Sequence, residues 1–244
     1  MIPRIFLLLG ICACLAGTAP AFGEVMRGQG QCGALTMAAS GTDSGPYDYR
    51  SAPALKISVV ETHHFTPKVE QLQAGLSTAY IGADIDFVLR YFPNHVRALV
   101  SMTALAKREK TDQPRGSRYR LDCWYDRAVR MAPTDMQVKV LYGYWLAKKG
   151  ERALALEQLD QVTEESLDSG NMAYNLGLGY IEAGAYDKAL AAAHVAYARG
   201  FPLPGLRNRL ERAGKWREPS AESIKKEPKA EPLEESSSGQ SESK

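Results

Sequence analysis

Two adjacent histidines, His63 and His64, offer the clearest opportunity for chemistry in this sequence. With His95, Asp84 and Asp86 they could supply nitrogen and oxygen ligands to zinc or a similar ion. Adjacent side chains do not face one way in a regular element, however, and the H-x-x-x-H and H-E-x-x-H spacings are absent. We therefore predict no metal site, and expect these histidines to form hydrogen bonds.

Motifs of catalysis are equally sparse. The sequence contains no G-x-S-x-G and no phosphate-binding glycine loop. The acidic pairs Asp84/Asp86 and Glu164/Glu165 are explained without chemistry if they occupy exposed helix or loop positions. The sequence predicts a protein that is not an enzyme, with no catalytic residues and no cofactor.

Aromatic side chains gather between residues 124 and 145. They are Trp124, Tyr125, Tyr142, Tyr144 and Trp145. Such rings can stack on sugars, so an accessory factor that binds polysaccharide or murein during envelope or exopolysaccharide assembly is our alternative function. Most of these positions are also suited to packing helices together.

Residues 1–21 are typical of a secretory signal peptide. A basic start at residues 1–4 precedes an apolar run at 5–16, and Ala19-Pro20-Ala21 provides small residues for cleavage. No later stretch is apolar enough to cross a membrane, which predicts a periplasmic or secreted bacterial protein. Attachment of a lipid at Cys14 is the alternative, although Cys12 stands where a small or β-branched residue is usual.

Removal of this peptide leaves two cysteines, Cys32 and Cys123. In an oxidising compartment we expect them to form a disulfide, with two buried free thiols as the alternative. The bond would close a loop of about ninety residues and attach the N-terminal segment to a helix.

The C-terminal segment, residues 218–244, contains seven Glu and four Lys but only two large apolar residues, Ile224 and Leu233. It cannot bury enough surface to fold alone, so we predict a disordered tail. The net charge of the whole chain is only +2, and the basic residues are scattered. Nucleic acid is therefore not an expected partner.

A repeat with the period of the tetratricopeptide class, about 34 residues, organises the sequence between 136 and 203. The pairs that define it are Gly143/Gly177, Leu146/Tyr180, Gly150/Gly184 and Ala155/Ala189. We expect the first glycine of each unit to allow close helix packing, the second to end the first helix in a left-handed turn, and the alanine to mark the helix crossing.

Helical patterns extend the repeat in both directions. Helices are predicted at 95–107 and 123–133 with an insertion of about eight residues between them, and a degenerate hairpin at 61–93 with helices at 67–76 and 84–92. A polar capping helix is expected at 206–213. Residues 22–60 are predicted to be irregular, and 94–217 to form one repeat domain.

Tyr180, Gly184, Tyr186, Ala189 and Ala196 stand at positions that resemble the tetratricopeptide (TPR) repeat family over about 110 residues. Leu146 and Leu167 depart from the family's tyrosine and proline. The N-terminal block looks like the leader of secreted bacterial TPR proteins. The resemblance implies an all-α fold, a short right-handed solenoid of three to four hairpins.

In TPR stacks the first helix of each hairpin lines a concave groove, so the resemblance implies an exported adaptor or scaffold that binds a protein or peptide segment there. The residues it places on that face are Arg97, Val100, Lys107, Tyr144, Lys148, Asn171, Tyr174, Leu178 and Glu182. Their mixture of cations, amides and tyrosines suits an extended peptide or a helix that bears carboxylates. The oligomeric state is not predicted.

Overall fold

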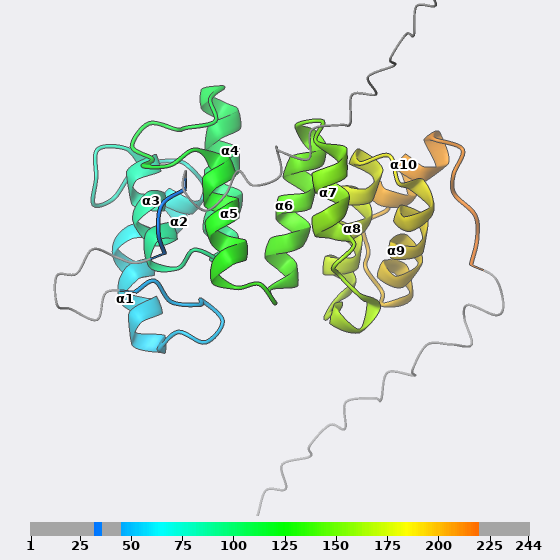
Figure 1. Ribbon diagram of the computed structural model, residues 1–244, viewed down its shortest axis with the longest axis horizontal. Coiled ribbons are helices and arrows are strands. Elements are labelled where there is room, and N and C mark those ends of the chain that lie inside the picture. Colours follow the sequence, from blue (N-terminus) through cyan, green and yellow to red (C-terminus); the bar gives the residue numbers. More distant parts are fainter. Residues whose placement is uncertain (1–31, 36–44, 220–244) are drawn as a thin grey trace, which may run out of the picture.

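The computed structural model describes residues 32–35 and 45–219. The predicted signal peptide, Cys14 and residues 220–244 of the predicted tail lie outside them. All regular structure in the described part of the chain is helical (Figure 1), which confirms the all-α class. None of the described helices is long and apolar enough to span a bilayer.

The helices follow one another along the long axis of the molecule (Figure 1), and within this row α6 packs on α8 as well as on α7. They are α1 (Ala54–His64), α2 (Pro67–Glu70), α3 (Ile81–Tyr91), α4 (Val96–Glu109), α5 (Leu121–Met131), α6 (Met136–Lys148), α7 (Arg152–Leu159), α8 (Gly170–Glu182), α9 (Tyr186–Ala198) and α10 (Gly205–Arg212), with a 3₁₀ turn at Glu164–Ser166.

The predicted repeat period is confirmed by the helix bounds. The offset from the start of α6 to the start of α8 equals the offset from α7 to α9, and both equal the spacing of the glycine pairs in the sequence. The turns after α6 and α8 use Gly150 and Gly184 at φ +85° and +77°, a conformation that glycine adopts readily. At Gly143 a Cβ atom would lie 2.6 Å from the side chain of Leu159, so only glycine lets α6 approach α7 this closely.

The predicted insertion between α4 and α5 is also confirmed. Eleven residues separate these helices, against three between α6 and α7, so the excess is eight. The loop is fastened on both sides: the backbone N–H of Arg118 donates to Asp86 at 2.6 Å, and Lys149 reaches Asp112 at 2.9 Å.

Two elements differ from the sequence prediction, and two equivalent helices of the repeat differ in length. Residues 54–60, predicted to be irregular, are part of α1, which buries Val60. The helix predicted at 67–76 is the single turn α2, because the chain reverses at Leu72 with φ +60°. Helix α7 has eight residues where α9 has thirteen, and the chain after it turns inward to bury Val162 and Leu167.

The capping helix α10 buries Leu206 and Leu210. Arg209 of this helix turns toward α8 and donates to Glu182 at 2.7 Å.

Buried side chains form two large clusters that meet along α6. The first spans α1 to α5 and reaches Val138, and the second begins at Val140 and extends to α10. Helix α6 packs extensively on α8, whereas α4 touches α6 at few points. The row of helices therefore opens between α4 and α6.

The predicted disulfide between Cys32 and Cys123 is confirmed, with Cα atoms 4.9 Å apart. Arg127, one turn further along α5, is buried and donates to the carbonyl oxygens of Cys32 at 3.1 Å and Ala34 at 2.7 Å. A covalent bond and a guanidinium group thus hold the segment 32–35 against α5.

Candidate functional site

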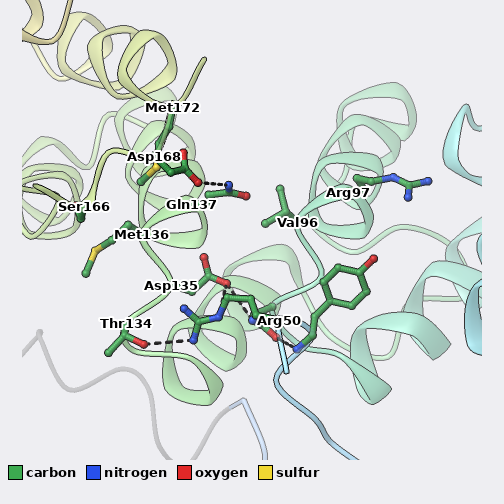
Figure 2. A pocket seen from close by; sticks show the side chains of 12 residues that line it. Arg50, Val96, Arg97, Thr134, Asp135, Met136, Gln137, Ser166, Asp168 and Met172 are labelled. Atoms are coloured by element: carbon green, nitrogen blue, oxygen red, sulfur yellow. Dashed lines mark hydrogen bonds and ion pairs between the residues drawn. The ribbon is translucent and has the colours of Figure 1, made fainter. Parts of the chain in front are cut away.

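A cavity of about 620 Å³ lies where α4 and α6 separate. Its walls are the first turns of α4, α6 and α8, the 3₁₀ turn and the segment before α1 (Figure 2). The lining residues are Tyr49, Arg50, Asn94, Val96, Arg97, Thr134, Asp135, Met136, Gln137, Ser166, Asp168 and Met172.

Two equivalent turns build its lower wall. The sequences Phe92-Pro93-Asn94-His95 and Ala132-Pro133-Thr134-Asp135 each lead into a helix of the row. His95 caps α4 by accepting from the Ala98 N–H at 3.1 Å, and Asp135 caps α6 by accepting from Val138 at 3.3 Å. These caps fix where the two helices begin and therefore the position of this wall of the cavity.

A strap formed by residues 47–50 ties these two turns together. Asn94 is buried and donates to Asp48 at 2.7 Å and to Asp135 at 2.9 Å. Arg50 pairs with Asp48 at 2.6 Å, donates to Thr134 at 3.2 Å and lies 3.6 Å from Asp135. The Arg50 guanidinium lowers the pKa of Asp48 to about 2, with further help from Asn94.

A second network fixes the α4 side. His95 Nδ1 accepts the capping bond, so Nε2 carries the proton and donates to Glu61 at 2.9 Å. Burial lowers the pKa of His95. Tyr49 also donates to Glu61, at 2.7 Å, and burial followed by this bond raises the pKa of Tyr49 to about 12. Arg97 makes two bonds to Glu70, at 2.7 and 2.6 Å.

The remaining wall combines apolar and polar groups. Val96 and Met136 are half-buried and Met172 is buried. At the rim the exposed side chain of Asp168 accepts from Gln137 at 3.4 Å and from Ser169 at 2.8 Å. Figure 2 shows Asp168 and Gln137 on one side of the cavity, while Arg97 points away from them.

Of the residues predicted to bind a partner, only Arg97 lines this cavity. Lys148 and Glu182 form an ion pair at 3.4 Å that joins α6 to α8. Tyr174 packs on Phe201 with ring centroids 4.4 Å apart, and Leu178 packs against the second cluster. These positions lie on the successive helices α4, α6 and α8, as the repeat predicts. The rest are exposed or half-buried: Val100, Lys107, Tyr144 and Asn171.

Sequence reasoning missed most of the cavity. Tyr49, Arg50 and Asp168 lie outside the helices, in segments to which no motif assigned a role. One signal was available: Pro93 and Pro133 stand two residues before equivalent helix caps and mark the two turns as related.

The histidine and aspartate residues considered as metal ligands are divided among separate hydrogen bonds. His64 pairs with Asp84 at 3.0 Å, His95 with Glu61, and Asp86 with Arg90 at 2.8 Å. Asp84 and Asp86, which we expected at exposed positions, are buried. The described residues contain no group of three such side chains that could hold an ion.

The aromatic residues considered for sugar binding fall into two groups. Trp124 and Tyr125 are buried, so their rings are unavailable to a ligand. Tyr142 and Trp145 are half-buried, and their rings stack with centroids 6.1 Å apart and an interplanar angle of 24°.

Comparisons with protein-family models, with curated proteins and with solved structures found no match for this chain.

Proposed function

We propose that this chain is an exported adaptor of the tetratricopeptide type, a short right-handed solenoid that binds a protein or peptide segment along α4, α6 and α8. The observation that carries the proposal is the cavity of about 620 Å³, which is formed jointly by the first turns of three successive first helices. A cavity of this size is in the range that binds ligands.

The helix geometry supports the family assignment. The hairpins α6–α7 and α8–α9 repeat at one constant offset, each has a left-handed glycine after its first helix, and the capping helix closes the second cluster. Exposed side chains such as Asn171 and Lys107 extend the contact surface from the cavity along the same helices.

Site-specific cross-linking tests the proposal. Benzoylphenylalanine introduced at Gln137 or Asn171, both exposed, should form adducts with the same partner in the envelope of the producing cell. The matched control is Ala191, exposed on α9, which contributes neither to the cavity nor to the predicted groove. Adducts at Ala191 alone, or at none of the three positions, would contradict the proposal.

Export is supported by the Cys32–Cys123 bond, since disulfides persist in oxidising compartments. The mass of the mature protein tests it. A chain that begins at Phe22 is expected, and a lipid-bearing chain that begins at Cys14 would instead show anchoring.

The half-exposed Tyr142–Trp145 stack favours a second candidate, binding of polysaccharide or murein. Sedimentation with purified murein tests it, and protein that stays in the supernatant would count against it.

A further inference from the structure

We infer that the cavity at the first turns of α4, α6 and α8 binds the side chain of a lysine or arginine residue of the partner. The inference rests on the proposed function and adds the chemistry that is recognised. It reverses the expectation, drawn from the cations in the sequence, that the partner presents carboxylates.

The charges around the cavity favour a cation. The lining residues by themselves have no net charge, since they include two cations, Arg50 and Arg97, and two anions, Asp135 and Asp168. The groups that pair with them add only carboxylates, namely Asp48, Glu61 and Glu70. His95 is neutral, because its Nδ1 accepts a hydrogen bond. Two guanidinium groups against five carboxylates give these residues a net charge of −3, which Arg199 reduces to −2, because its side chain donates to the Leu167 carbonyl at 2.6 Å, next to Asp168.

Both guanidinium groups already form ion pairs. Arg97 points away from the other lining residues (Figure 2) and makes its two short bonds to Glu70. Arg50 is held by Asp48, Thr134 and Asp135. An incoming carboxylate would have to share a guanidinium group with the carboxylate that it already binds, whereas an incoming cation would not.

Three helix N-termini oppose this preference but do not reverse it. Each contributes a partial positive charge of roughly +0.5 that fades within one turn, about +1.5 in all for α4, α6 and α8. This sum is smaller than the negative charge around the cavity, and one N–H group of each helix is already capped, by His95, Asp135 and Ser169 respectively.

The apolar wall suits the stem of a long basic side chain. Val96, Met136 and Met172 offer methyl and methylene groups, and methionine adapts its shape to a ligand. At the rim, Asp168 accepts only two hydrogen bonds from described residues, so its carboxylate keeps capacity for an ammonium or guanidinium group. An apolar channel that ends at a carboxylate is complementary to lysine and arginine.

Titration of the full mature chain, labelled with ¹³C at the methionine methyl groups, tests this inference without a partner. The probes are the N-acetyl amides of lysine, arginine, norleucine and glutamate. We expect saturable shifts of the Met136 and Met172 methyl signals with lysine and arginine, and much weaker ones with the other two. Met102, buried in the first cluster, is the internal control and should not respond.

Asp168→Asn should weaken binding of the lysine probe roughly fivefold through loss of a charge-assisted hydrogen bond. Glu165→Gln makes the same charge change in the same loop outside the lining and should leave binding unchanged. Equal shifts with norleucine, larger shifts with glutamate, no shifts at all, or equal weakening by both variants would each overturn the inference. Its failure is distinguishable from failure of the proposed function, because cross-linking reports occupancy of the groove and titration reports the charge preference of the cavity.

Discussion

Arg127 binds the carbonyl oxygen of Cys32 at 3.1 Å, one helical turn after the cysteine to which Cys32 is covalently joined. The disulfide and the Arg127 side chain therefore both hold the segment 32–35 from one face of α5. Because Arg127 is buried, its hydrogen bonds depend on the segment staying in place.

Reduction of the disulfide should lower the free energy of unfolding by about 4 kcal/mol, since the bond closes a loop across 91 positions and restricts the unfolded chain. Urea unfolding with and without reductant measures this. The double variant Cys32→Ser/Cys123→Ser should be insensitive to reductant, and equal midpoints for the oxidised and reduced wild type would contradict the prediction.

Acid should destabilise the protein through His95. Because burial lowers the pKa of this residue below its ordinary value of 6.5, the unfolded chain binds the extra proton more readily. The stabilisation that neutral His95 gives the folded state is therefore fully present above about pH 6.5. It is lost as the pH falls from there through the lower pKa of the folded state. Protonation also removes the cap of α4, worth about 1 kcal/mol.

The variant His95→Asn keeps a capping acceptor without a titrating ring. Thermal unfolding followed between pH 7.5 and 5 should show a steeper loss of stability in the wild type than in this variant. Parallel curves would show that His95 does not carry the effect.

Gly143→Ala should destabilise the protein by about 1–3 kcal/mol even though alanine favours a helix by about 1 kcal/mol. The new Cβ would lie 2.6 Å from Leu159 and 3.1 Å from the carbonyl oxygen of Ala155. Gly150→Ala meets no atom within 4 Å and is disfavoured only by its φ of +85°, so about 1 kcal/mol is expected. Urea midpoints of the two variants, compared with wild type, test whether close helix packing explains Gly143.

Asp84→Ala should cost about 3 kcal/mol and loosen the loop before α3. The buried carboxylate accepts from the backbone N–H groups of Leu76 at 2.8 Å and Ser77 at 3.3 Å, and these donors would lose their partner. Asp84→Asn retains one acceptor oxygen and should cost less. Hydrogen exchange at Leu76 and Ser77 measures the effect, and unchanged protection in Asp84→Ala would contradict it.

The parts of the fold that could be predicted depend on local spacing. A fixed interval separates Gly150 from Gly184 and Ala155 from Ala189, because the two helices of each hairpin pack in the same way. The disulfide could be predicted because only two thiols remain after the signal peptide is removed. Helix α1 could not be predicted, since its sequence is rich in β-branched residues and buries only Val60.

The cavity could not be predicted for a different reason. It exists because α4 touches α6 at few points, which no local pattern encodes, and because Asp48 and Arg50 bond to Asn94 and Thr134, which are distant in the sequence. Counting along a repeat identified Arg97 but not its orientation, which Glu70 determines.

The position of the disulfide affects how the chain can fold while it is being synthesised or exported. Both cysteines precede α6, so the bond lies wholly within the portion that supplies the first cluster. A chain that emerges from its N-terminus, whether from a ribosome or through a membrane pore, can form this bond before α6 to α10 arrive. The first half can thus be covalently secured while the second half is still in transit.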